Sequence, residues 1–303
     1  MSARPASAGA GGARPFGATG SAVALVVAGL ACQEIGASIA VLLFPDVGPL
    51  GMVMLRLVFS AIILLVVARP SLRRHGRSSW LAVARFGLVL AAMNGLFYLA
   101  LERLPLGVTV TIEVLGPLAL SIIAARAASS WVWAGLALLG VVALAGGGWD
   151  RLDLLGVLCA LGAAAAWAFY ILSSARVGAA FPKLDGLALA MTVGAVASLP
   201  FGIADAGAAL LRPEILGLGA AVALLSSTLP YAFELVALRK LPASAFAILM
   251  SLAPAIAALA GFVLLGQHLS WGELIGIALV VGASIGAVRA AGRRAVAEPS
   301  VSG

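Results

Sequence analysis

Hydrophobic residues in this chain are gathered into stretches of about twenty, separated by short segments that hold most of the charged positions. A helix rises about 1.5 Å per residue, so a stretch of this length can cross a hydrocarbon layer of roughly 30 Å. The connections are all short, which leaves no room for an attached soluble domain. The pattern predicts transmembrane helices at residues 19–44, 49–68, 79–101, 106–126, 130–147, 154–176, 186–208, 215–237, 243–265 and 271–290.

The composition agrees with a location in the membrane. Hydrophobic residues make up 63% of the chain and charged residues 10%, with a mean hydropathy of +1.14, whereas soluble domains are about 45–50% apolar. We therefore predict an all-α membrane protein with ten transmembrane helices. Residues 1–18 and 291–303 have the composition of flexible tails. The first helix is too long for the apolar core of a cleavable signal peptide, which is about 7–15 residues.

The basic residues orient the bundle, because Lys and Arg in short loops are retained on the cytoplasmic side. With the N-terminus inside, fourteen Lys and Arg residues face the cytoplasm, and only Arg103, Arg151 and Arg212 face outward. Both termini are therefore predicted to be cytoplasmic, in a multi-pass protein of the inner membrane. This distribution also accounts for the net charge of +7, so nucleic-acid binding is not expected.

The two halves of the chain resemble each other. The segment 100–105, AlaLeuGluArgLeuPro, matches AlaLeuArgLysLeuPro at 237–242, and Pro117 pairs with Pro254 at the same offset of 137 residues. A first repeat at 19–147 and a second at 154–290 would each hold five helices, and an odd number inverts the second copy. Inverted repeats are the architecture of many secondary transporters that work by alternating access.

Three charged residues lie deep within predicted helices, where a charge costs at least about 2.5–3.5 kcal/mol and normally faces protein or a wet cavity. Glu34 and Glu113 are the best candidates to bind a substrate ammonium group or a coupling proton. Arg56 could form a structural ion pair with one of them, or could bind a substrate carboxylate through its two-pronged guanidinium group. The sequence leaves both roles of Arg56 open.

Further candidates share faces of other predicted helices. Aromatic residues in helices more often serve packing than binding, and Glu234 lies near a helix end, where it could be simply solvated. Four prolines inside the spans each remove an amide N–H, which frees a backbone carbonyl and permits a kink. The candidate cavity residues are Asn94 and Tyr98, Trp167 and Tyr170, and Ser227, Tyr231 and Glu234; the prolines are Pro117, Pro200, Pro230 and Pro254.

Five stretches, at 93–99, 104–118, 166–173, 225–234 and 249–254, closely resemble the threonine/homoserine exporter group of the EamA-type families, within the drug/metabolite transporter superfamily. The similarity spans about residues 20–290. It implies a ten-helix inner-membrane exporter of small amino acids and related metabolites. The chain departs from this group at Ala253 and Gln267, where the resemblance leads us to expect acidic residues.

The sequence gives little support for a disulfide framework, a metal site or a catalytic site. Cys32 and Cys159 both lie in apolar stretches, which excludes a disulfide framework, and no Cys/His cluster, P-loop or HExxH motif is present. The pattern GlyAlaSerIleGly at 282–286 resembles a nucleophile elbow but lies within a predicted helix, where glycine-mediated packing explains it better. We predict neither enzyme activity nor a cofactor or metal.

The predicted function is export of small amino acids, threonine- or homoserine-like, by proton antiport, with Glu34 or Glu113 exchanging a proton for the substrate. The expected partners are the small-molecule substrate, protons and the lipid bilayer. A transporter of another metabolite or a toxic cation is the main alternative, and a channel or structural membrane protein is a weaker one. The sequence leaves the oligomeric state open, a homo-oligomer included.

Overall fold

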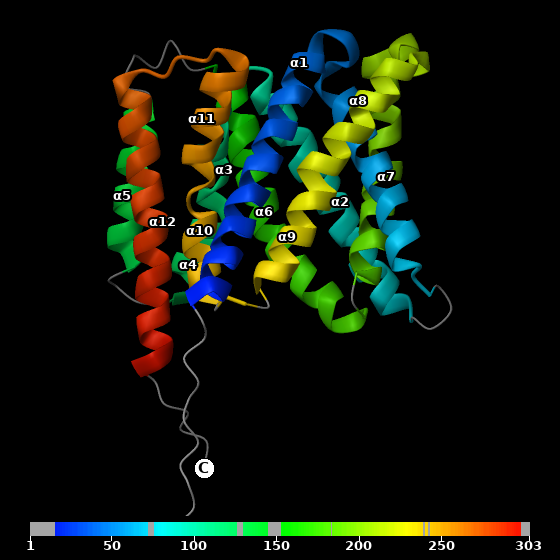
Figure 1. Cartoon of the computed structure of the whole chain (residues 1–303). Coiled ribbons are helices and arrows are strands. Elements are labelled where there is room, and N and C mark those ends of the chain that lie inside the picture. The colour runs from blue at the N-terminus through cyan, green and yellow to red at the C-terminus, as the bar shows by residue number, and fades with distance from the viewer. Residues whose placement is uncertain are drawn as a thin grey trace, which may run out of the picture.

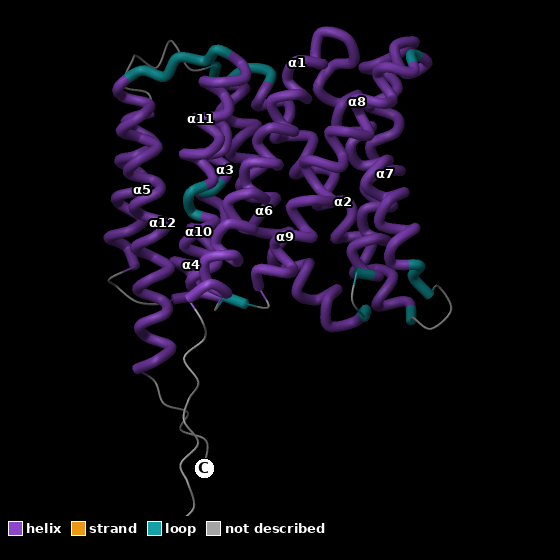
Figure 2. Tube along the Cα trace, viewed as in Figure 1, coloured by secondary structure: helices purple, strands orange, loops and turns teal. Residues whose placement is uncertain are grey.

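The computed structural model describes residues 16–71, 76–125, 130–144, 153–182, 184–238, 240–241 and 243–297. The described chain is helical apart from short loops and turns (Figure 2). In a bilayer this follows from the need of every backbone amide and carbonyl for a partner, which a helix supplies within one segment. The helices, packed side by side in Figure 1, are α1 (Phe16–Ala68), α2 (Arg77–Leu101), α3 (Leu106–Glu113), α4 (Leu115–Ala125), α5 (Ser130–Leu144), α6 (Leu154–Ala180), α7 (Asp185–Ala206), α8 (Pro213–Ala223), α9 (Leu229–Leu238), α10 (Ala243–Met250), α11 (Ala253–Leu265) and α12 (Trp271–Ala297).

Among the described residues, seven segments are long and apolar enough to cross a membrane. The chain is thus an all-α, multi-pass membrane protein, as predicted. The apolar helices Ser130–Leu144 and Pro213–Thr228 are shorter. The seven segments are Gly20–Ala68, Arg77–Leu101, Leu106–Ala124, Leu154–Ala180, Asp185–Leu211, Ala245–Leu265 and Trp271–Ala291.

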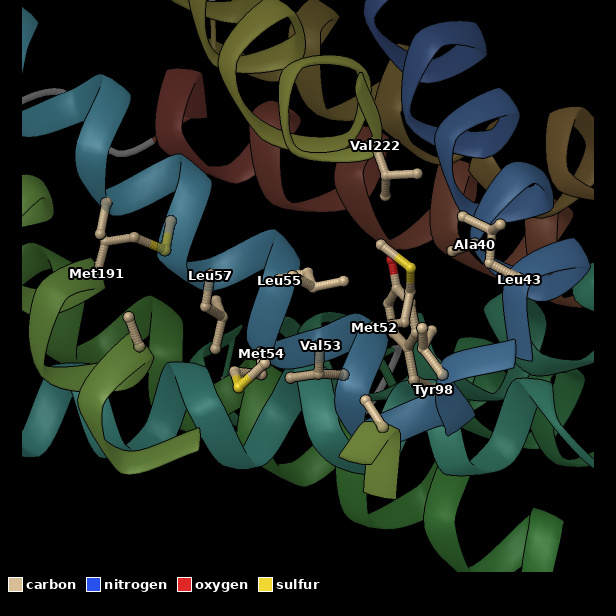
Figure 3. Packing of buried hydrophobic residues seen from close by; sticks show 14 of the residues in the cluster. Ala40, Leu43, Met52, Val53, Met54, Leu55, Leu57, Tyr98, Met191 and Val222 are labelled. Atoms are coloured by element: carbon tan, nitrogen blue, oxygen red, sulfur yellow. The ribbon is translucent and has the colours of Figure 1, made fainter. Parts of the chain in front are cut away.

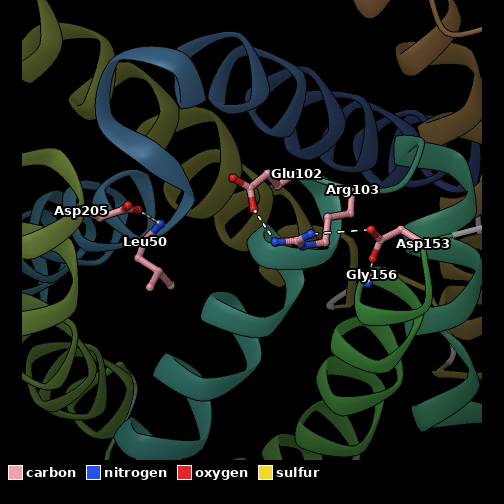
Figure 4. A network of polar contacts seen from close by, with 6 residues as sticks. All are labelled: Leu50, Glu102, Arg103, Asp153, Gly156 and Asp205. Atoms are coloured by element: carbon pink, nitrogen blue, oxygen red, sulfur yellow. Dashed lines mark hydrogen bonds and ion pairs between the residues drawn. The ribbon is translucent and has the colours of Figure 1, made fainter.

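The longest segment, α1, consists of two helices joined at a kink. Gly48 has φ 66° and ψ 166°, a non-helical conformation that is essentially restricted to glycine. The carboxylate of Asp205 in α7 accepts hydrogen bonds from the amides of Leu50 (2.8 Å) and Gly51 (3.3 Å), which begin the second helix (Figure 4). Those amides have no partner within their own helix. The side chain of Asp205 therefore stabilises the break in α1.

Two other spans are broken in their middle. The helices α3 and α10 each contain eight residues and end 137 residues apart, at Glu113 and Met250. The chain then continues into α4 and α11 after a short interruption. Figure 2 shows the turn between α10 and α11 about halfway along the height of the bundle. Pro117 and Pro254 lie just beyond these breaks, and each lacks the N–H that would bond to the carbonyl four residues earlier.

The main core cluster lies where the second part of α1 packs against α2 and α7. Met52, Leu57 and Tyr98 are almost completely buried there, and Figure 3 shows side chains of α1 close to Met191 of α7. Elsewhere α5 and α12 approach at two glycines, because a Cβ at Gly276 would lie 2.7 Å from the carbonyl oxygen of Gly140. Small residues at such crossings let backbones pack closely.

The glycine pattern at 282–286 lies within the continuous helix α12, as predicted. Gly286 packs against Trp133 of α5, in agreement with a packing role. The same prediction is wrong for Gly282, because a Cβ added there would meet nothing within 4 Å. Gly282 therefore faces away from the α5–α12 contact.

Charged residues cluster near the helix ends. Arg103 pairs with Glu102 and with Asp153, whose carboxylate also caps α6 through the amide of Gly156 (Figure 4). Arg212 pairs with Glu214 and Asp46, each at 2.9 Å, and these hydrogen bonds raise the pKa of Arg212. Such exposed pairs are screened by solvent and contribute little to stability.

Candidate functional site

Most of the candidate polar residues surround one cavity inside the bundle, with a volume of about 200 Å³. We call it the polar cavity. It is lined by seven of the ten candidates, together with six residues that were not among them. The seven are Glu34, Arg56, Asn94, Glu113, Trp167, Tyr170 and Glu234, and the six are Gln33, Ala37, Met93, Phe97, Ser226 and Met250.

The two halves of α1 both contribute to the polar cavity. Glu34 lies before the kink at Gly48 and Arg56 lies after it, so the break brings residues of both segments to the same space. Glu34 is only 1% exposed, and its Oε2 atom has no hydrogen-bond partner among the described residues. A buried carboxylate oxygen without a partner is costly unless water or a ligand reaches it. This oxygen is therefore suited to bind a cationic group or a proton.

Glu113 lies at the broken end of α3 and is the second carboxylate in the polar cavity. It interacts electrostatically with Glu34 and Arg56. Two hydroxyls one turn from the carboxylates bond to backbone instead: Ser38 donates to the Glu34 carbonyl at 2.8 Å, and Thr109 donates to the Pro105 carbonyl at 3.1 Å. The carboxylates consequently stay available to the cavity.

Arg56 is held by residues of α2 and of the turn before α9. Its Nη2 donates to the carbonyl oxygen of Ser226 at 3.0 Å, and its Nε and Nη1 donate to Ser227 Oγ and Tyr98 Oη, both at 3.4 Å. The guanidinium carbon lies 5.7 Å from the centre of the Tyr98 ring, a cation–π distance. Tyr98 and Ser227 therefore support Arg56, whereas Arg56 itself faces the polar cavity.

The sequence explains why the Ser226 carbonyl is available. In a regular helix this carbonyl would accept from the amide four residues later, but that residue is Pro230, which has no N–H. The segment Leu224–Thr228 forms a π-helical turn at this point, a feature that is frequent at functional sites. The missing donor of Pro230 leaves the carbonyl free for Arg56.

The same rule applies to two other cavity residues. Pro117 and Pro254 lie four residues after Glu113 and Met250, so the carbonyls of those two residues also lack their usual helical donor. Glu113, Ser226 and Met250 all line the polar cavity. Three prolines thus remove helical donors beside one cavity, and the carbonyl of Ser226 bonds to Arg56 in place of a helical amide.

The remaining candidates are placed as follows. Asn94 lines the polar cavity and donates from Nδ2 to the carbonyl of Leu90 at 2.8 Å, which leaves its side-chain oxygen free to face the cavity. Tyr170 packs its ring 5.1 Å from that of Phe86, so it combines packing with cavity lining. Tyr231 lies in α9, but its side chain is not among those that the structure describes.

The two departures from the expected acidic pattern do not line the polar cavity. Ala253 is buried at the start of α11. Gln267 accepts a hydrogen bond through Oε1 from the amide of Leu106 at 2.9 Å, and so caps the first turn of α3. An acidic side chain could accept the same bond, so this departure preserves the local structure.

The six cavity residues that the sequence analysis did not select are all uncharged. Met93, Phe97, Ser226 and Met250 lie within stretches that carry the family resemblance, and this was the one signal that could have identified them. A metal site is not indicated, because no group of three or more His, Cys, Asp or Glu residues is suitably placed in the described part of the chain.

Comparison with known proteins identifies close relatives. The EamA-like transporter family model matches residues 154–289. The chain is similar to the threonine/homoserine exporter RhtA of Escherichia coli K12, with 38% identity over 266 residues, or 87% of this chain and 90% of the exporter. The exporter of the same name from Salmonella typhimurium LT2 is 40% identical over 253 residues, or 83% of this chain and 85% of the exporter.

A solved crystal structure also shares the fold. It aligns with a TM-score of 0.61 and 18% sequence identity, covering 91% of this chain and 99% of the other chain. The arrangement of helices is therefore one already known from experiment.

Proposed function

The chain belongs to the EamA-like transporter family as a homologue of the threonine/homoserine exporter RhtA, and from this premise we propose that it exports small amino acids across the inner membrane by alternating access, driven by proton antiport. The family is one of transporters, so the protein is not an enzyme. The observation that carries the proposal is the polar cavity, where carboxylates and a guanidinium group line one space.

The cavity offers complementary groups to both ends of an amino acid. Glu34 and Glu113 supply negative charge for the ammonium group. Arg56 supplies positive charge and donors for the carboxylate. In the proposed cycle, one of the two glutamates releases a proton when the substrate ammonium binds and takes up a proton when the substrate leaves.

Alternating access requires two halves that move against each other, and the sequence offset of 137 residues supports such a division. We propose ten crossings in two inverted five-helix repeats, residues 19–147 and 154–290, with both termini in the cytoplasm. The matching eight-residue helices α3 and α10 support the repeat. In Figure 1, α3 lies above α4 whereas α10 lies below α11, as expected for opposite directions.

The test is counterflow of radiolabelled L-threonine and L-homoserine in proteoliposomes, measured with and without a pH gradient. Glu113→Gln should abolish pH-driven transport while the melting temperature stays near that of the wild type, since Gln keeps the size and hydrogen bonding but cannot ionise. Glu102→Gln is the matched control, because Glu102 is an exposed residue paired only weakly with Arg103, at 3.7 Å.

Wild-type protein that fails to transport either amino acid would refute the proposed function. Uptake of organic cations alone would favour the toxic-cation alternative. Normal pH-driven transport by Glu113→Gln would leave amino-acid export intact but remove this carboxylate from the coupling scheme.

A further inference from the structure

A second cavity adjoins the polar cavity and differs from it in chemistry. It has a volume of about 300 Å³ and is lined by α4, α6, α10 and α12. We call it the apolar chamber, because its walls are mainly aliphatic and aromatic, with Leu118, Ile171 and Phe246 among them. Trp167 and Met250 line both spaces. The apolar chamber and the polar cavity therefore share part of their walls.

The sizes of the two spaces indicate that they act together. Pockets that enclose small molecules are usually about 300–1,000 Å³, and the polar cavity alone is smaller, at about 200 Å³. It offers charged groups for the ammonium and carboxylate ends of an amino acid, but the chamber beside it provides most of the available volume. A substrate whose charged ends occupy the polar cavity would direct a long side chain past Trp167 and Met250.

One polar atom in the chamber wall indicates that the chamber is not packed core. Ser284 of α12 is 7% exposed, and its Oγ has no hydrogen-bond partner among the described residues. Many buried serines in helices donate to a carbonyl of their own helix, as Ser251 does to Ala247 at 3.0 Å. A hydroxyl left without a partner in an apolar wall can bond to a water molecule, and a chamber of about 300 Å³ has room for such a water beside an aliphatic side chain. The chamber therefore has the character of a binding space rather than of packed core.

We propose that the apolar chamber is a side-chain subsite, and that the substrates of this transporter include amino acids with extended apolar side chains, such as leucine. The inference rests on the proposed function, because it takes the polar cavity as the site of the ammonium and carboxylate groups. Trp167 and Met250 line both spaces, so a side chain that extends from the polar cavity into the chamber would pass these two residues. Threonine and homoserine are small enough to bind without using the chamber.

The experiment compares counterflow of L-leucine and L-threonine in proteoliposomes containing the full chain. Ala247 lines the chamber and does not line the polar cavity, so Ala247→Leu should fill the chamber from one wall. We expect this variant to lose at least tenfold in leucine transport and to keep threonine transport within twofold. Ala255→Leu, at an exposed position of α11 that does not line the chamber, should change neither. Thermal melting checks that both variants are folded.

Three results would overturn the inference. Threonine transport without leucine transport or competition by leucine would show that the chamber is not a subsite, while the proposed function would stand. Equal losses for both amino acids in a folded Ala247→Leu variant would assign the chamber to the common transport path. Failure of the wild type to transport any amino acid would remove the proposed function and this inference with it.

Discussion

Pro230 affects the backbone carbonyl of Ser226, four residues earlier, because proline has no N–H to donate to it. The Ser226 carbonyl accepts from Arg56 at 3.0 Å, and Pro230 has no N–H that could compete for it. The guanidinium group also donates hydrogen bonds to Ser227 Oγ and Tyr98 Oη, both at 3.4 Å. Three contacts from two elements therefore hold the Arg56 side chain in one conformation. Without them, a side chain of this length would populate several rotamers.

This arrangement predicts the effect of Pro230→Ala. The new amide would bond to the Ser226 carbonyl, convert the π-helical turn toward a regular helix and deprive Arg56 of its closest acceptor. Hydrogen bonds to charged groups contribute about 1.5–3 kcal/mol, so the KM for threonine counterflow should rise about tenfold while stability is maintained or improved. Pro213→Ala is the control, because Pro213 is the first residue of α8, where an amide has no helical partner. Unchanged KM values for Pro230→Ala would contradict this account of Arg56.

The role of Arg56 itself can be decided with Arg56→Met. If Arg56 binds the substrate carboxylate, the variant should remain folded and lose its preference for threonine over the decarboxylated amine, 1-amino-2-propanol, measured by competition. If Arg56 is a structural partner of the glutamates, its removal leaves buried charge uncompensated, which typically costs about 3–5 kcal/mol. The melting temperature would then fall, and adding Glu34→Gln or Glu113→Gln would restore part of it. We expect the first result, because Arg56 lines the polar cavity and its guanidinium group is held in place by hydrogen bonds to Tyr98, Ser226 and Ser227.

At the scale of the helix, the kink in α1 depends on one glycine and one carboxylate from α7. Gly48 occupies a region of φ and ψ that costs other residues about 1–3 kcal/mol, and a Cβ there would also contact the Asp205 carboxylate. Gly48→Ala should therefore lower the melting temperature by several degrees. Gly217→Ala provides the contrast, because Gly217 lies in α8 with nothing within 4 Å of an added Cβ, so alanine should be neutral or stabilising by up to about 1 kcal/mol. Equal melting temperatures for the two variants would exclude a strained turn at Gly48.

The sequence predicted the positions of the helices well, because apolar length and the limits of helices are local properties. The predicted boundary after residue 44 and restart at 49 correspond to the kink at Gly48, and the predicted start at 106 is the first residue of α3. The interruptions inside spans were harder to predict. The prolines indicated that kinks were permitted, but they did not predict the π-helical turn at Leu224–Thr228. Nor did they predict its contact with Arg56, which lies 170 residues away from Ser226.

For the molecule as a whole, the sequence identified the charged centre of the cavity but not its walls. Glu34, Arg56 and Glu113 could be selected because charge is expensive in a membrane. Met250 and Met93 could be identified only through the family resemblance, since the chemistry of an apolar side chain in an apolar helix does not indicate which space it faces. The apolar chamber beside the cavity arises only when α4, α6, α10 and α12 pack together, and their crossing geometry is not readable from hydropathy.

Orientation in the membrane is also a property of the whole molecule, and the distribution of basic residues predicts it. If both termini are cytoplasmic, position 75 lies inside and position 268, in the loop before α12, lies outside. His75→Cys and His268→Cys would be made in a background with Cys32 and Cys159 replaced, because both native cysteines are free. A membrane-impermeant maleimide added to intact cells should label only position 268, and both positions should react once the membrane is permeabilised. The reverse pattern would contradict the predicted orientation and place both termini on the outer side.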